Sequence, residues 1–371
     1  MSIAVLAFVG CGQSRTGEIP VESISVGGVF ALTGLGAAIG EQEYMGAQLA
    51  VEEVNTAGGI DGKQVKFVVE DVSLDKLSSG PSAVQKLVNV DNVVGIVGPT
   101  WDEPAAQILP IIEEARIPIL MPDQTVDVES LQSFSFAFST WYDNRVGVRE
   151  LLRYAQSHDL KRIAIVRSVA GGFWQFTRDE FVMRAPEFGV EVVEDIDVGN
   201  PLELDFRTVL IKVKEKRPDA IFAVVTDYNE CAFLKQMKEL GINVPLLSTE
   251  SSGTAAALGQ CPDLMENVFF STPHKTHLYK DFAQRFKAKF EHEPQFPSVA
   301  TSYDAMKILL SVIEETGSTD GKVLREGLKQ LDEYQGVSFE SIYFDEMGFV
   351  KTPEDAFEMM TVREGAFVSV P

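Results

Sequence analysis

The sequence is poor in basic residues. Its 371 residues include 32 lysines and arginines against 55 aspartates and glutamates, so the formal net charge is −23 at pH 7. A chain this acidic is repelled by phosphate backbones, and no cluster of lysines or arginines forms a local exception. We therefore expect no nucleic-acid partner.

Long hydrophobic runs are also absent. The longest, Met1 to Gly10, is well short of the roughly 18–20 residues that a membrane-spanning helix needs. It ends at Cys11, and small residues before a cysteine at the end of an apolar run resemble a bacterial lipoprotein signal. The resemblance implies a lipid anchor on Cys11, with residues 13–22 as a polar tether. The alternative is a disordered N-terminus that happens to contain a cysteine.

Cysteine itself is scarce. After Cys11 only Cys231 and Cys261 remain, which is too few for a disulfide scaffold in a domain of this size. The sequence leaves open whether these two cysteines pair or stay as buried thiols. It therefore does not identify the redox compartment.

Sequence signals of catalysis are lacking as well. No Gly-x-Ser-x-Gly motif and no phosphate-binding loop occurs. Residues 34–40 resemble a dinucleotide-binding loop, but three residues instead of two separate the last two glycines. His274 and His277, with Asp281 nearby, are too few ligands for a metal site. We expect neither an enzyme nor a metal or organic cofactor.

The chain does contain a regular alternation of β-rich and helical segments from Ser23 onward. Strands are predicted at residues 24–30, 65–69, 93–97, 117–121, 162–166, 190–196, 220–225 and 268–271. Helices are predicted at residues 42–55, 81–90, 104–115, 145–156, 206–216, 230–240, 277–291 and 299–315, and further short strands at residues 337–344 and 356–370. Apolar strands separated by amphipathic helices predict parallel sheets covered on both faces. The alternation restarts near Arg162, which predicts an α/β protein with two lobes.

Several short motifs, in this order, resemble the Leu/Ile/Val-binding family of type I periplasmic receptors for ABC importers. They are Val29-Phe-Ala-Leu-Thr-Gly34, Gly40-Glu-Gln-Glu-Tyr-Met-Gly46, Ala50-Val-Glu-Glu-Val-Asn55, Ala57-Gly-Gly-Ile-Asp-Gly62, Phe67-Val-Val-Glu-Asp71, Val97-Gly-Pro-Thr100, Ile117-Pro-Ile-Leu-Met-Pro122, Arg162-Ile-Ala-Ile-Val166 and Thr301-Ser-Tyr-Asp-Ala305. Each motif alone is weak, whereas the ordered set is specific. The resemblance extends from about residue 24 to the C-terminus.

The resemblance implies two doubly wound parallel-sheet lobes with a ligand cleft between them. Three crossings are expected near residues 141–144, 271–273 and 345–348. This divides the chain into a signal and tether (1–22), a first lobe (23–142 plus 272–345) and a second lobe (143–271 plus 346–371). The implied protein is an extracytoplasmic, monomeric receptor that closes around a branched-chain amino acid or a related amino or amide compound for an ABC permease. A ligand sensor that signals to a partner protein is the alternative.

The resemblance also implies a set of ligand-binding positions. They are Ile39, Trp101, Asp102, Glu103, Gln124, Thr125, Phe173, Trp174, Thr226, Asp227 and Glu250. Glu250 corresponds to the acid that pairs with the ligand ammonium, and Thr125 to a threonine that helps to hold it. Asp102 stands where relatives present a serine to the ligand carboxylate. Since a fixed anion there repels a carboxylate, and Asp123 adds to the acidic set, a cationic or amine ligand is favoured.

Structural roles remain open for most of these residues. Asp102, two residues before a proline, is a good helix N-cap. Thr125 could cap the following turn, and Glu250 could be a solvated loop acid. The aromatic pair Phe173 and Trp174 could stack on a ligand or simply pack between the lobes. Arg167 could meet a ligand carboxylate, although a surface position is the alternative.

Overall fold

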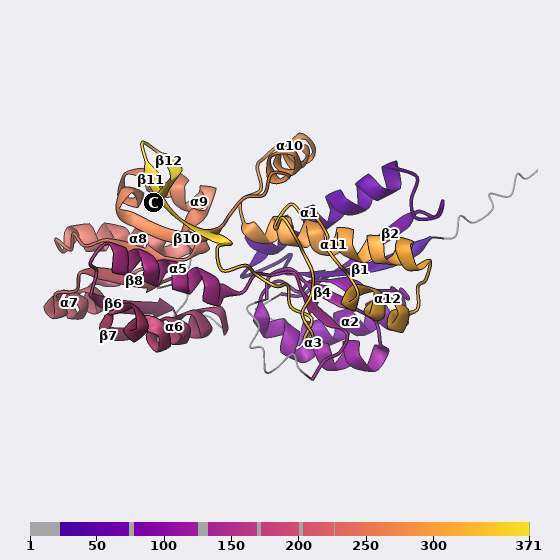
Figure 1. The fold of residues 1–371 in the computed structure, drawn as a ribbon, viewed down its shortest axis with the longest axis horizontal. Coiled ribbons are helices and arrows are strands. Elements are labelled where there is room, and N and C mark those ends of the chain that lie inside the picture. Colours follow the sequence, from indigo (N-terminus) through magenta and orange to yellow (C-terminus); the bar gives the residue numbers. More distant parts are fainter. Residues whose placement is uncertain are drawn as a thin grey trace, which may run out of the picture.

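A computed structural model describes residues 23–73, 78–124, 133–168, 172–199, 203–225 and 227–370. These residues form two α/β lobes, each built on its own sheet and covered by helices on both faces (Figure 1). The first sheet has five strands in the order β2-β1-β3-β4-β5, and the second has seven in the order β12-β11-β10-β9-β8-β6-β7. The predicted fold class is confirmed. No described helix is long and apolar enough to cross a bilayer.

The first sheet is entirely parallel. Its strands are β1 (Ile24–Phe30), β2 (Val65–Asp71), β3 (Ile96–Val97), β4 (Ile119–Met121) and β5 (Ala137–Ser139). Its helices are α1 (Ala37–Thr56), α2 (Ser79–Asn89), α3 (Asp102–Ala115), α10 (Tyr279–Phe290), α11 (Pro297–Thr316) and α12 (Gly321–Lys329). α1 and α11 lie side by side on one face (Figure 1). Their close approach requires Gly46, where an added Cβ would lie 2.4 Å from the Val299 carbonyl oxygen.

The second sheet combines parallel strands with an antiparallel edge. Its strands are β6 (Arg162–Ser168), β7 (Glu191–Val198), β8 (Ala220–Val224), β9 (Leu246–Ser248), β10 (Val268–Pro273), β11 (Phe357–Arg363) and β12 (Ala366–Val370). Its helices are α5 (Asn144–Ser157), α6 (Gly172–Arg184), α7 (Arg207–Lys216), α8 (Asp227–Glu239) and α9 (Ala255–Gln260), with the 3₁₀ turns η2 (Ala185–Phe188), η3 (Glu250–Gly253) and η4 (Pro262–Asn267). β10, β11 and β12 pair antiparallel, so the chain end completes this lobe.

The strand predicted at residues 337–344 is wrong. This segment forms only isolated bridges, one between Tyr334 and Ile342 and one between Phe344 and Val350. The reason is Asp304, a fully buried carboxylate on α11 that accepts hydrogen bonds from the backbone N–H groups of Val337 (3.0 Å) and Ser338 (2.8 Å). These N–H groups are therefore satisfied by a side chain and do not enter a ladder.

Segments that run between the lobes are tied to one another. The segment after β5 bonds to the segment before β11, since the Ser139 N–H donates to the Gly348 carbonyl (2.7 Å) and the Asp143 N–H donates to the Thr352 hydroxyl (2.9 Å). β10 pairs with the start of β11, where Pro273 lies opposite Phe357. The connection between the lobes is thus a small hydrogen-bonded unit rather than a set of independent linkers.

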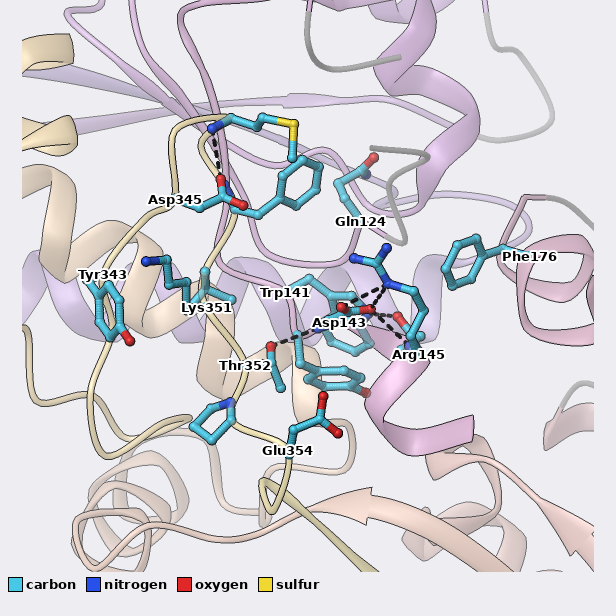
Figure 2. Close-up of a pocket in the computed structure, with 16 residues that line it drawn as sticks. Gln124, Trp141, Asp143, Arg145, Phe176, Tyr343, Asp345, Lys351, Thr352 and Glu354 are labelled. Atoms are coloured by element: carbon cyan, nitrogen blue, oxygen red, sulfur yellow. Dashed lines mark hydrogen bonds and ion pairs between the residues drawn. The ribbon is translucent and has the colours of Figure 1, made fainter. Parts of the chain in front are cut away.

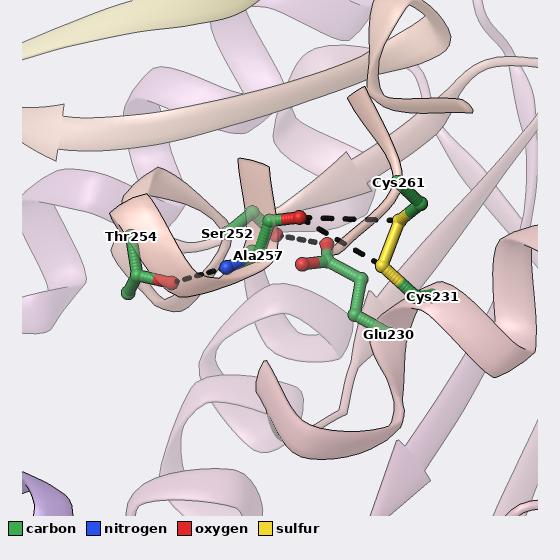
Figure 3. Close-up of a disulfide and its surroundings, with 6 residues drawn as sticks. All are labelled: Glu230, Cys231, Ser252, Thr254, Ala257 and Cys261. Atoms are coloured by element: carbon green, nitrogen blue, oxygen red, sulfur yellow. Dashed lines mark hydrogen bonds between the residues drawn. A yellow bond between two sulfur atoms is a disulfide. The ribbon is translucent and has the colours of Figure 1, made fainter. Parts of the chain in front are cut away.

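Cys231 and Cys261 form a disulfide, which answers a question that the sequence left open (Figure 3). Their Cα atoms are 5.9 Å apart, and the bond joins α8 to the residue that follows α9. It closes a 30-residue separation that contains β9 and η3. A disulfide of this kind is typical of oxidising compartments.

The double substitution Cys231→Ser/Cys261→Ser should lower the free energy of unfolding by about 3 kcal/mol, because the open chain has more conformational freedom when unfolded. Denaturant titration of the oxidised protein and of the double variant measures the difference. Adding a reductant to the variant is the control and should change nothing further. Equal unfolding midpoints for the two proteins would contradict a stabilising role.

Candidate ligand-binding site

The site begins at Glu250, at the carboxyl end of β9. Ligands of open parallel sheets bind at this edge. Glu250 opens the turn η3 and is 7% exposed. Burial raises the pKa of its carboxyl group from 4.5 to about 7, although its own backbone N–H and the nearby Tyr142 hydroxyl act in the opposite direction. A carboxyl group in this position is half protonated near neutral pH when no cation accompanies it.

A second acidic group lies in the first lobe, where Asp123 follows β4. A parallel bridge joins Asp123 to Thr100 in the loop after β3. The Thr100 hydroxyl donates to Oε2 of Glu43 (2.6 Å) and accepts from the Ala31 N–H (3.1 Å). Glu43 projects from α1 and is fully buried. The backbone therefore holds this carboxylate in place through one hydroxyl group.

The carboxyl groups of the two lobes act on one another. Burial raises the pKa of Asp123 from 3.8 to about 6, and the charge of Glu103 raises it further. The pKa of Glu43 is raised well above its ordinary value by burial and then by Asp123. The charge of Asp123 also contributes to the raised pKa of Glu250. Asp123 is therefore the common neighbour of acids from both lobes.

Tyr142 lies in the segment that connects the lobes, next to this acidic group. Its ring stacks on Trp141, with centroids 4.0 Å apart and an interplanar angle of 29°. Its hydroxyl is buried and makes no hydrogen bond of normal geometry. Burial, followed by the charges of Glu250 and Asp123, raises the pKa of Tyr142 well above its ordinary value. The hydroxyl therefore stays protonated and can act as a donor.

Aromatic side chains from both lobes meet beside the acids. Trp101 precedes α3 and packs edge-on against Trp174 of α6, with centroids 5.7 Å apart and an interplanar angle of 86°. Phe173 packs edge-on against Trp174 at 5.4 Å. The Gly172 N–H, at the start of α6, donates to Oε1 of Glu103 (3.1 Å). The contacts of Trp101 with Trp174 and of Glu103 with Gly172 join the lobes directly.

Two cavities adjoin the connecting segments, and Tyr142 lines both. A cavity of about 100 Å³ lies between Glu250 and the start of α11 and is also lined by Gln295, Phe296 and Thr301. A larger one, of about 500 Å³, is lined by Gln124, Trp141, Asp143, Arg145, Phe176, Tyr343, Asp345, Lys351, Thr352 and Glu354, among others (Figure 2). Space is therefore present where the lobes meet.

A family profile described as periplasmic binding protein matches residues 23–366. The chain belongs to the periplasmic binding protein family. Members of this family are extracytoplasmic solute-binding receptors and do not form a class of enzymes. One relative is the leucine-, isoleucine-, valine-, threonine- and alanine-binding protein of Pseudomonas aeruginosa, 23% identical over 318 residues that cover 84% of this chain and 83% of the relative.

Solved structures show the same fold for this periplasmic binding protein. LivJ of Streptococcus pneumoniae, a branched-chain amino acid transporter substrate-binding protein in complex with isoleucine, superposes with a TM-score of 0.83 at 24% identity, over 94% of this chain and 99% of LivJ. A solute-binding protein of an ABC transporter from Rhodopseudomonas palustris, in complex with 3,4-dihydroxybenzoic acid, gives a TM-score of 0.82 at 19% identity over 94% and 96%. The fold therefore accommodates chemically different ligands.

Cationic side chains near this site of the periplasmic binding protein have other partners. Arg167 donates through Nε to Asp197 (2.9 Å) and also bonds Gln175, so it is not available to a ligand carboxylate. Arg145 pairs with Asp143 (2.8 Å; Figure 2). Within the described ranges, Glu43, Glu103, Asp123 and Glu250 form no ion pair with a lysine or arginine. The described residues also contain no group of three or more His, Cys, Asp or Glu placed to hold a metal ion.

The structure places the predicted ligand-binding residues in different settings. Asp102 is the first residue of α3, and Trp101, not Asp102, occupies the N-cap position. The Gln124 amide donates to the carbonyl oxygens of Trp101 and Pro99. It therefore helps to hold the aromatic wall, which is formed by Trp101 and Trp174. Ile39 is half-buried and packs against the core of the first lobe.

Two predicted residues, Thr125 and Thr226, lie outside the described residues, and Asp227 begins α8. Glu43 and Tyr142 are missing from the predicted set. The sequence contains only weak signals for these two residues. Glu43 lies on the apolar stripe of the helix predicted at residues 42–55, and Tyr142 lies within the crossing predicted at residues 141–144.

The ligand-free protein should lose stability between pH 5 and pH 8. The folded-state pKa values of Glu250 (about 7) and Asp123 (about 6) lie above their ordinary values, so the folded state binds more protons than the unfolded state in this range. Their contribution is therefore fully present below the ordinary values of 3.8 and 4.5 and is lost as the pH rises through the folded values.

Thermal melts across this range should show the midpoint falling by several degrees. Glu250→Gln should flatten the fall, whereas Glu114→Gln, at an exposed position of α3, should not. An identical slope for Glu250→Gln and the wild type would contradict the burial of an acid at this position.

Proposed function

We propose that this receptor captures a small compound with a primary amine, such as an amino acid or a related amine or amide, and delivers it to an ABC permease. The observation that carries the proposal is Glu250, a buried carboxyl group without a cationic partner among the described residues. Burying an unpaired carboxylate is unfavourable, and a ligand ammonium that forms charge-assisted hydrogen bonds to it relieves this. The amino-acid ligands named for the Pseudomonas and Streptococcus proteins support an amino compound.

The proposed mechanism is capture by hinge closure. With the lobes apart, the ligand binds at Glu250; the lobes then rotate about the connecting segments and exclude water. The contacts of Trp101 with Trp174, and of Glu103 with the Gly172 N–H, join residues of opposite lobes and therefore stabilise the closed form. The ligand shifts the population toward that form, whose shape the permease recognises.

We also propose that Cys11 is a lipid anchor and that the receptor works as a monomer outside the cytoplasm. The apolar run before Cys11 and the polar tether after it support the anchor. The Cys231–Cys261 disulfide supports an oxidising compartment.

Glu250→Gln should weaken binding of an amine ligand about tenfold to hundredfold, because a neutral amide replaces the charge that accepts from the ammonium. A thermal-shift screen of amino acids, amines, amides and small carboxylates identifies a ligand, and a hundredfold excess over Kd raises stability by about 2.7 kcal/mol. Isothermal titration then compares the variants.

Without ligand, the Glu250→Gln variant should be at least as stable as the wild type at or above neutral pH, since the substitution removes a carboxyl group that is buried without a cation. Glu114→Gln is the control for the loss of one negative charge and should bind normally. Unchanged affinity in Glu250→Gln would show that Glu250 does not anchor the ligand.

A further inference from the structure

We propose that the cleft contains a second cation subsite, formed by Glu43 and Asp123 of the first lobe, and that the ligand is a diamine-type compound without a carboxylate. Glu250 of the second lobe would take one cationic nitrogen, and the Glu43–Asp123 pair would take the other. The inference rests on the proposed function and names the ligand class of that same cleft.

Buried polar atoms without partners converge on the proposed subsite. Oε1 of Glu43 is inaccessible to solvent and makes no hydrogen bond of normal geometry, although its other carboxylate oxygen is held by Thr100. The hydroxyl of Ser298, in the first turn of α11, is also buried and unpartnered. Ser298 lies close enough to Glu43 to lower its pKa, and Asp123 lies close enough to raise it. A buried carboxylate oxygen without a partner of normal geometry, with a hydroxyl beside it, suits the N–H donors of a ligand ammonium.

The two carboxyl groups of the subsite interact with one another. Burial raises the pKa of both, and the charge of Asp123 raises that of Glu43 further, whereas the hydrogen bond with Glu43 lowers that of Asp123. Without a cation, the pair therefore holds a proton to a higher pH than two exposed carboxyl groups would. A ligand ammonium with three N–H donors could bond both carboxylates and would displace that proton. Binding of the second cationic group should therefore release protons.

The surroundings disfavour a ligand carboxylate. Asp102 and Glu103 occupy the first turn of α3, at the helix end that would otherwise attract an anion. Arg167 is paired with Asp197. A zwitterionic amino acid would therefore place its carboxylate against fixed negative charge. The aromatic wall of Trp101 and Trp174 instead suits a hydrocarbon chain and its cationic ends.

A metal ion fits the subsite less well than an organic cation. The described residues offer no group of three or more acidic, histidine or cysteine side chains in suitable positions. Two carboxylates and the Ser298 hydroxyl can instead accept from an ammonium with ordinary hydrogen-bond geometry.

The test is isothermal titration of the full chain with α,ω-diamines of three to six carbons, 1-aminopentane, 5-aminopentanoate and L-leucine. A diamine should bind at least tenfold more tightly than 1-aminopentane, and 5-aminopentanoate more weakly than the diamine of equal length. Asp123→Asn and Glu43→Gln should each reduce the ratio of diamine to monoamine affinity at least tenfold. Glu114→Gln, which removes one exposed charge, should leave this ratio unchanged.

A second measurement does not depend on any variant. Titrations of the wild type at pH 6.5 in buffers of different ionisation enthalpy should show more protons released by the diamine than by 1-aminopentane. Because this measurement uses only the wild type, it tests the second subsite even if Asp123→Asn fails to fold.

The outcomes separate the two proposals. Tight binding of L-leucine or 1-aminopentane without a diamine preference would overturn the second subsite and leave the amine receptor intact. Equal proton release by diamine and monoamine would also overturn the subsite. Binding of small carboxylates alone, with no amine bound, would overturn both proposals.

Discussion

The burial of carboxyl groups between two lobes is the constraint on which the site depends. Glu250 ends a strand of the second lobe, while Glu43 and Asp123 belong to the first, and no described lysine or arginine pairs with them. Each acid is unfavourable in its position unless it is protonated or meets a cation. In the proposed mechanism, approach of the lobes increases this penalty and a cationic ligand removes it. The same electrostatic interaction would then link ligand binding to lobe closure.

One of the segments that connect the lobes contributes a residue, Tyr142, that lies beside the buried acids. Tyr142 lies between Trp141, on which it stacks, and the acids Glu250 and Asp123, which raise its pKa. A rotation of the lobes about these segments would move both acids relative to one hydroxyl group. The backbone bonds between Ser139 and Gly348 and between Asp143 and Thr352 make the segments move as one unit. The hinge thus also contributes a polar group to the site.

Much of the fold could be predicted because local patterns and tertiary packing agree. The strands at residues 24–30 and 162–166 and the helices at residues 104–115 and 299–315 follow directly from apolar periodicity. The strand predicted at residues 337–344 did not form, because a side chain distant in sequence, Asp304, accepts hydrogen bonds from the backbone N–H groups of Val337 and Ser338. β5, a strand of three residues, was not predicted.

The sequence by itself determined the α/β class, the two lobes and the receptor family, since these follow from periodicity and ordered motifs. Only the tertiary structure decided that Cys231 pairs with Cys261, that Arg167 is occupied by Asp197, and that Glu43 lies against Asp123. These relations join residues 30 to 80 positions apart in the chain. Contacts between residues this far apart in the chain depend on how the helices and strands pack, and no local sequence pattern predicts them.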